Sequence, residues 1–146
     1  MDVPLDHPLL VNHQFQARAQ ELCETRSLVR KALGQGICSS ISVEDIVLAI
    51  DEACQNIIRH AYQGETDDLI VLHIYQRDNT LVIMLRDYGP NVGKDCMKPR
   101  DLEDLRPGGL GCHFIQQVMD EVSMGPPPEG IGNVLQMVKH LGPERK

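Results

Sequence analysis

The spacing of hydrophobic residues predicts two helices in the first half of the chain. Residues 19–33 place leucine and valine side chains at helical spacing among charged residues, and Gly34 follows as a stop signal. A second helix is expected over residues 43–62, where Ser42 and Asp45 resemble a capping pair. Its predicted buried stripe consists of Ile46, Ala49, Ile50, Ala53, Ile57 and Ala61. Each helix is therefore expected to cover a hydrophobic core with one face.

Runs of aliphatic and β-branched residues predict strands before and after these helices. Residues 9–15 alternate weakly between polar and apolar positions and are expected to form an edge strand. Residues 68–77 and 80–89 are largely apolar and are joined by Asp78 and Asn79, which favour a tight hairpin turn. The two segments are therefore expected to pair as an antiparallel hairpin.

The last third of the chain is less regular. Residues 90–107 show little periodicity and are expected to form a long loop of the kind that often serves as a functional lid. A third helix is expected over residues 110–121, and it has to end before Gly125 and the prolines at 126–128. The segment 133–141 is apolar enough to form a final strand.

The order strand, helix, helix, strand, strand, helix, strand predicts an α+β fold. Helices that follow this order pack best on one face of a sheet, which gives a two-layer α/β sandwich. A chain of 146 residues has room for one such core, so residues 1–146 are expected to form a single domain.

Composition narrows the classes of partner. The formal charge of -7 disfavours nucleic-acid binding, which depends on neutralisation of phosphates by basic groups. No apolar run is long enough for a membrane span, and the N-terminal residues lack the features of a signal peptide, so a cytoplasmic location is expected. The five cysteines show no close pairing, which favours free thiols over disulfides or a zinc site.

The first chemical motif is Glu52 with Asn56, in the predicted helix over residues 43–62. Side chains four residues apart share a helix face, so the carboxylate and the amide are able to face one ligand. An amide oxygen suits Mg²⁺, which takes few protein ligands, and a carboxylate nearby suits a general base. The alternative is an ordinary solvated surface, because Glu52 and Asn56 continue into a polar stripe with Arg59 and Gln63.

The second motif, Asp87-Tyr88-Gly89, follows the second hairpin strand. A carboxylate accepts hydrogen bonds only, so a buried Asp87 is suited to bind the exocyclic amino group of adenine. Gly89 allows the backbone to bend or a flat base to approach closely. A plain turn after a strand is the alternative explanation.

The third motif, Gly108-Gly109-Leu110-Gly111, stands directly before the third predicted helix. Glycines at this position allow backbone amides to converge on an anion at the positive end of the helix dipole. The alternative is a flexible hinge, because the pattern is neither a P-loop nor a dinucleotide-binding fingerprint.

Together the three motifs resemble the N, G1 and G2 boxes of the GHKL ATP-binding superfamily, the Bergerat fold. The similarity lies in the stretches EACQNIIRHAY, RDYGP and RPGGLGCHFIQQVMDEV, and it extends over most of the chain. Within the superfamily the sequence is most similar to the bacterial anti-sigma-factor serine kinases. This resemblance implies a mixed sheet with helices on one face and a flexible ATP lid over about residues 90–108.

The resemblance also implies roles for individual residues. Asn56 would bind Mg²⁺, Glu52 would be the catalytic base, and Asp87 would bind adenine. The lid residue Arg106 would stabilise the transferred phosphoryl group, while His60 and Arg59 flank the site. The pocket and the phosphate loop would be shaped by Gly89, Gly108, Gly109, Leu110 and Gly111.

One position departs from the family pattern. The last strand usually begins with Gly-Thr, and the threonine hydroxyl supports the adenine-binding aspartate. Here Gly132 is followed by Asn133, whose amide is also a donor but has a different reach. Adenine binding therefore depends on whether Asn133 reaches Asp87.

The function implied by the resemblance is an ATP- and Mg²⁺-dependent protein serine kinase. It would phosphorylate a small STAS-like antagonist protein, bind a sigma factor in turn, and form a homodimer. One alternative is a nucleotide-dependent partner-binding switch without catalytic activity. Another is the detached catalytic domain of a sensor histidine kinase.

Overall fold

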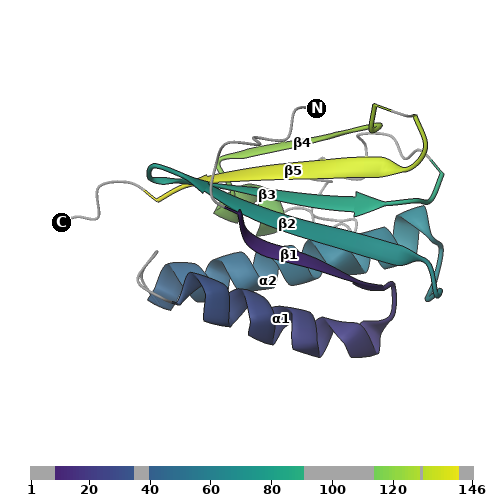
Figure 1. The fold of residues 1–146 in the computed structure, drawn as a ribbon, viewed down its shortest axis with the longest axis horizontal. Helices are drawn as coiled ribbons and strands as arrows, with labels where there is room; N and C mark the ends of the chain where they lie inside the picture. The colour runs from purple at the N-terminus through teal and green to yellow at the C-terminus, as the bar shows by residue number, and fades with distance from the viewer. Residues whose placement is uncertain (1–8, 35–39, 91–113, 129, 142–146) are drawn as a thin grey trace, which may run out of the picture.

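A five-stranded antiparallel sheet carries the fold, and two long helices lie side by side along one of its faces (Figure 1). The structure is a computed structural model, which describes residues 9–34, 40–90, 114–128 and 130–141. The elements in chain order are β1 (Leu9–Gln16), α1 (Ala19–Leu33), α2 (Ser40–Asn56), η1 (Ile57–Ala61), β2 (Leu69–Arg77), β3 (Thr80–Asp87), β4 (Glu121–Gly125) and β5 (Asn133–His140).

The hydrophobic core lies between the helices and the inner face of the sheet. Alternate residues of β2, namely Ile70, Leu72 and Ile74, are completely buried against the helices. All six members of the stripe predicted for the second helix are buried as well. The predicted α+β fold with helices on one face of the sheet is therefore confirmed.

Three predicted elements agree closely with the structure. The helix α1 has the predicted bounds, and β1 is an edge strand, because the strand order is β1-β2-β3-β5-β4. The pair β2 and β3 forms the predicted hairpin, with Arg77 opposite Thr80 and Asp78 at a positive φ of 54°. Asp and Asn tolerate this left-handed conformation better than most residues do, which is why the turn was recognisable.

The second helix differs from its prediction at both ends. It begins at Ser40, so Ser42 lies inside the helix and does not cap it. The predicted start was therefore too late by three residues. At the other end the α-helix stops at Asn56, and residues 57–61 form one π-helical turn.

The third helix was predicted too long. The described residues are helical over 114–118, and Glu121 begins the strand β4 instead of ending a helix. Val122 and Met124 pack against the core, while Glu121 and Ser123 are exposed, which is the alternation of a strand. Five residues of this pattern after a helix were too short a signal to separate the two elements.

The missed strand also explains why the sheet is not mixed. Each pairing between the described strands is antiparallel, whereas the family resemblance implied a mixed sheet. A helix running directly from β3 into the last strand would form a crossover and make the two strands parallel. The additional strand β4 reverses the chain once more, so β5 runs antiparallel to β3.

The described part of the chain contains no helix that is long and apolar enough to cross a membrane. Its two cysteines, Cys23 and Cys54, are free, as predicted; the first is exposed and the second is buried. The other three, Cys38, Cys96 and Cys112, lie outside the described residues.

A buried carboxylate connects the two long helices. Asp51 of α2 is only 7% exposed, and its Oδ1 accepts a hydrogen bond of 2.8 Å from Arg26 Nη1 of α1. Its other oxygen accepts a hydrogen bond of 2.7 Å from Gln55 Nε2, one turn further along α2. The negative charge of Asp51 is thus compensated by the Arg26 guanidinium and by an amide hydrogen of Gln55. Asp51 directly precedes Glu52, the candidate base.

We expect Arg26→Ala to destabilise the fold by about 1 to 3 kcal/mol, because it leaves a buried carboxylate without its charged donor. Chemical denaturation measures this loss as a decrease in the free energy of unfolding. The matched control is Arg30→Ala, in the same helix as Arg26, which removes the exposed ion pair between Arg30 and Glu44. Its loss of unfolding free energy is expected to be clearly smaller, because water screens that pair. Equal losses for the two variants would contradict a special role for Asp51.

Candidate functional site

The helix that carries Glu52 and Asn56 ends in a wide turn. The amide of Tyr62 donates to the carbonyl of Ile57, five residues earlier, at 3.0 Å, and the amide of Gly64 donates to the carbonyl of Ile58 at 2.7 Å. The chain then leaves the helix through Gln63, at a positive φ of 59°. Single π-helical turns of this kind occur often at functional sites, because they redirect the side chains that follow.

The polar stripe on this helix is not an ordinary solvated surface. Asn56 is only 5% exposed, and its Oδ1 accepts a hydrogen bond of 3.1 Å from Arg59 Nη2. Glu52 is partly buried, whereas Gln63, at the end of the same stripe, is exposed. The solvated-surface alternative is therefore wrong for Asn56, and Arg59 joins the site as a direct partner of Asn56.

The environment of Glu52 makes it a stronger proton acceptor. Burial raises the pKa of Glu52 above its ordinary value, and the nearby charge of Asp51 acts in the same direction. The guanidinium of Arg59 opposes both effects and lowers the pKa. A carboxylate with a raised pKa holds a transferred proton better, which is what a general base requires.

Asp87, at the end of β3, is fixed by two donors on one oxygen. Its Oδ1 accepts hydrogen bonds from the Gly89 amide at 3.0 Å and from Asn133 Nδ2 at 2.9 Å. No described residue donates to its other oxygen. Burial raises the pKa of Asp87, while the hydrogen bonds from Asn133 and Gly89 lower it. The side chain therefore has one oxygen that holds it in place and one that no described residue engages.

Two glycines allow the backbone around Asp87 to pack closely. A Cβ atom on Gly89 would lie 2.7 Å from the carbonyl oxygen of Ala61 in η1. A Cβ atom on Gly132 would lie 2.1 Å from the carbonyl oxygen of Asp87, and Gly132 also has a positive φ of 92°. Gly89 is thus required by the close approach of η1, and Gly132 by both its conformation and its neighbour.

Asn133 does reach Asp87, although threonine is the usual residue at its position. Its amide nitrogen donates to Asp87 Oδ1 and also to the carbonyl oxygen of Pro90, at 2.9 Å in each case. An amide nitrogen carries two hydrogens, whereas a hydroxyl carries one, so Asn133 is able to hold both groups at once. The departure from the family pattern therefore keeps the support of Asp87 and adds a second contact.

The structure brings the first two motifs together and leaves the third undescribed. The contact between Gly89 and Ala61 joins the turn after β3 to the end of the helix that carries Glu52 and Asn56. His60 is exposed beside Arg59 in η1. Arg106 and the segment 108–111 lie outside the described residues.

The residues of this site fit a nucleotide with Mg²⁺. The Nε atom of Arg59 is buried and has no hydrogen-bond partner among the described residues, so it is a donor beside Asn56 that suits an anionic group. In the described segments no three His, Cys, Asp or Glu side chains are grouped to hold a metal. Mg²⁺ is usually held by one or two protein oxygens together with phosphate and water.

A separate hollow of about 230 Å³ lies on the sheet face that the helices leave uncovered. It is lined by Val71, His73, Met84, Arg86, Tyr88, Pro127, Pro128 and Val134, and the Arg86 guanidinium lies 4.5 Å from the centre of the Tyr88 ring. Neighbouring residues of a strand point to opposite faces, so Tyr88 faces this hollow while Asp87 points to the helix side. The hollow contains none of the predicted site residues.

Comparison with known proteins identifies the family. The family model described as the histidine kinase-like ATPase domain matches residues 15–139, which is most of the chain. The chain belongs to this family. The match includes both described motifs and the segment that carries the third, so the superfamily resemblance of the sequence is confirmed.

Curated relatives within the family are named serine-protein kinase RsbW. One from Halalkalibacterium halodurans is 33% identical over 107 residues, which are 68% of this chain and 63% of the relative. Another, from Bacillus velezensis, is 30% identical over 112 residues, which are 70% of this chain and 68% of the relative. The match thus spans about two thirds of these relatives or slightly less.

Solved structures of other proteins share the fold at low sequence identity. A chain of the SiaB–SiaC complex from Pseudomonas aeruginosa superposes with a TM-score of 0.65 at 17% identity, and the match covers 92% of each chain. The RsbU and RsbW domains of a Mycobacterium tuberculosis protein give a TM-score of 0.63 at 16% identity, covering 92% of this chain and 32% of that one. These likenesses support the fold assignment.

Sequence reasoning missed two parts of the site. Tyr62 stands at the end of the first motif, and its side chain contacts the second motif, as described below. Arg26, on a different helix, pairs with Asp51 next to Glu52. Tyr62 was at least within the quoted stretch EACQNIIRHAY, whereas no local pattern connects Arg26 with Asp51.

We expect Asn133→Ala to destabilise the fold by about 1 to 3 kcal/mol near neutral pH, because a buried carboxylate loses a donor. Burial raises the pKa of Asp87, so its stabilising contribution is complete below the ordinary Asp value and is lost as the pH rises through the raised value. Loss of the Asn133 donor raises the pKa of Asp87 further. The cost of the substitution should therefore shrink as the pH falls through that range.

Unfolding free energies of wild type and Asn133→Ala, measured across acid and neutral pH, test this expectation. The control is the same substitution in an Asp87→Asn background, where the pH dependence of the cost should disappear. A cost that does not change with pH in the wild-type background would show that Asn133 acts through Pro90 alone.

Proposed function

We propose that this chain is an ATP-dependent protein serine kinase. The observation that carries the proposal is the arrangement of Asp87. Its Oδ1 is held by Gly89 and Asn133, and its turn contacts the helix end that carries Glu52 and Asn56. Asp87, the proposed acceptor for adenine, thus lies in a segment that adjoins the helix end. The proposed Mg²⁺ ligand, Asn56, and the proposed proton acceptor, Glu52, belong to that helix.

The proposed roles follow from the chemistry of each side chain. Asp87 accepts a hydrogen bond from the adenine amino group through the oxygen that no described residue engages. Asn56 offers its amide oxygen to Mg²⁺, and the Arg59 guanidinium beside it, which now donates to that oxygen, offers its buried Nε to a phosphate. Bound ATP supplies the phosphoryl group, and bound Mg²⁺ neutralises part of its charge.

Glu52 is proposed as the base that accepts the proton of the substrate hydroxyl. Its raised pKa supports this role, and so does its position one helical turn before Asn56. Arg106 is proposed to stabilise the transferred phosphoryl group, and the glycines at 108, 109 and 111 with Leu110 to bind phosphate. These four glycine-loop positions and Arg106 remain predictions from the sequence.

The proposed substrate is a serine on a small antagonist protein of the STAS type, and the proposed second partner is a sigma factor. Relatives named serine-protein kinase RsbW support a protein substrate, and a complex of SiaB with SiaC supports binding of a second protein by this fold. A homodimer and a cytoplasmic location are kept as predictions.

The alternative is a nucleotide-dependent binding switch without transfer. The change from threonine to Asn133 and the unfamiliar lid motivated it. The hydrogen bond from Asn133 to Asp87 removes the first motivation, whereas residues 91–108 of the lid lie outside the described residues. The first experiment below separates the two functions through the chemistry of Glu52.

We expect Glu52→Gln to abolish phosphoryl transfer while leaving ATP binding unchanged. A general base contributes about 10²- to 10⁴-fold to a rate, and an amide has the same shape without the ability to accept a proton. Transfer from labelled ATP to a small antagonist protein of the STAS type is the measurement, and calorimetry gives the ATP affinity.

The matched control is Glu44→Gln, on the exposed side of the same helix, which should transfer phosphate like wild type. Equal transfer by Glu52→Gln and wild type would remove Glu52 from the mechanism. ATP binding by wild type without any transfer would favour the binding switch, and no ATP binding would contradict both functions.

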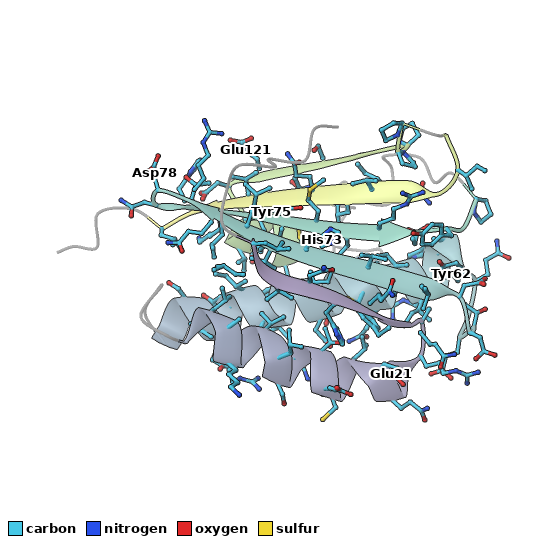
Figure 2. The ribbon with its side chains drawn as sticks, in the orientation of Figure 1. Glu21, Tyr62, His73, Tyr75, Asp78 and Glu121 are labelled. Atoms are coloured by element: carbon cyan, nitrogen blue, oxygen red, sulfur yellow. The ribbon has the colours of Figure 1, made fainter. Side chains whose placement is uncertain are left out.

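We expect Asp87→Asn to weaken ATP binding by about 1 to 3 kcal/mol, because either orientation of the amide sets a donor against another donor. Calorimetry of ATP binding is again the measurement. Asp78→Asn is a suitable control, because Asp78 lies at the opposite end of the sheet from Tyr62, which contacts the turn after β3 (Figure 2). An affinity equal to that of wild type would mean that Asp87 is a turn residue only.

A further inference from the structure

The hydroxyl of Tyr62 lies between the ends of two paired strands. Tyr62 follows η1 directly, and Figure 2 shows it at the end of the sheet that is remote from the Asp78 hairpin. Its hydroxyl donates to the carbonyl of Leu69, the first residue of β2, at 2.7 Å. The same oxygen accepts from the amide of Tyr88, the residue after β3, at 2.8 Å.

The directions of both hydrogen bonds follow from the groups themselves. A backbone amide is only a donor and a carbonyl is only an acceptor, so the single hydroxyl hydrogen must go to Leu69. Burial raises the pKa of Tyr62 to about 12, so the hydroxyl keeps this hydrogen at any ordinary pH. The bridge is therefore a fixed feature of the folded chain.

The register of the hairpin shows what this hydroxyl replaces. Arg77 and Thr80 flank the two-residue turn, and in such hairpins the flanking pair exchanges backbone hydrogen bonds. Every second pair along an antiparallel ladder does the same. Every second pair from Arg77–Thr80 onward would end with Leu69 opposite Tyr88. The pairing of β2 with β3 nevertheless stops one residue before this pair, at Ile70 opposite Asp87. The Tyr62 hydroxyl thus stands where a direct bond between Tyr88 and Leu69 would close the ladder.

The inserted hydroxyl separates the end of β3 from β2. A direct bond would bring Tyr88 against Leu69, whereas the bridge keeps the turn after β3 away from β2 and close to η1. Gly89 then meets the carbonyl of Ala61, the residue directly before Tyr62. The position of Asp87, one residue before the bridged amide, depends on this separation.

We infer that Tyr62 is a positioning residue for adenine recognition: its hydroxyl, inserted between Leu69 and Tyr88, sets the place of the Asp87 carboxylate. The inference rests on the proposed function, because it assigns Asp87 to the adenine amino group. Tyr62 itself contacts no reacting atom. Its effect is on which base is preferred, since Asn56 and Arg59, the residues proposed for Mg²⁺ and for phosphate, come before it in the chain.

The test compares the affinity for ATP with that for inosine triphosphate, which carries an oxo group in place of the amino group. Wild type should prefer ATP, and Asp87→Asn should lose this preference. Tyr62→Phe should reduce the preference by at least about fivefold, corresponding to about 1 kcal/mol, the usual value of one hydrogen bond. The loss should fall on ATP, with little change for inosine triphosphate.

Tyr75→Phe is the matched control, because Tyr75 is a buried tyrosine of β2 whose hydroxyl makes no hydrogen bond to a described residue. Its preference for ATP should equal that of wild type. A general loss of stability in Tyr62→Phe would weaken both nucleotides alike, so an unchanged preference overturns the inference. If wild type binds neither nucleotide, the proposed function itself is wrong.

A second measurement on wild type covers the case in which Tyr62→Phe does not fold. The bridge predicts that the Tyr88 amide exchanges its hydrogen slowly, although Tyr88 is 45% exposed and follows the last paired residue of β3. Slow exchange in the unliganded protein supports the inserted hydroxyl. Fast exchange would overturn it.

Discussion

The close approach between η1 and the turn after β3 is the constraint on which the site depends. A side-chain carbon at position 89 would lie 2.7 Å from the carbonyl of Ala61, so only glycine permits this distance. The π-helical turn η1 ends at Ala61, and this end of the helix places the Ala61 carbonyl beside the turn after β3. The Tyr62 hydroxyl then holds the turn from the other side. One backbone contact thus determines how the helix that carries Glu52 and Asn56 meets the strand that carries Asp87.

Periodicity was sufficient to predict much of the fold. The helix α1 and the β2–β3 hairpin follow from patterns that repeat over many residues, and their bounds agree with the structure. The buried stripe of α2 was predicted for the same reason. In contrast, β4 is five residues long and follows a helix, so its alternation was absorbed into the helical pattern. Because β4 reverses the chain before β5, the missed strand is also the reason why β5 pairs antiparallel with β3.

The site was predictable where its residues are close in sequence. Glu52, Asn56 and Asp87 were recognised from their motifs, and Asp87 and Asn56 are indeed buried. The residues that hold them come from distant segments, and no spacing relates them. The same limit applies to structural contacts, since the Glu65 carboxylate caps the N-terminus of α1 at Ala19 from 46 residues away. Such partners depend on the finished packing.

An acidic chain with a formal charge of -7 needs a way to receive an anionic ligand, and the described carboxylates show how this is arranged. Asp51 is paired with Arg26, which compensates part of its charge, and the remaining field of Asp51 contributes to the raised pKa of Glu52. Burial raises the pKa of Glu52, so a proton costs less there than on a solvated carboxylate. Asp87 is oriented by two donors, the Gly89 amide and the Asn133 side chain. The negative charge is therefore partly compensated at the helix that carries Glu52 and Asn56, while the end of β3 keeps a carboxylate that is held in place as an acceptor.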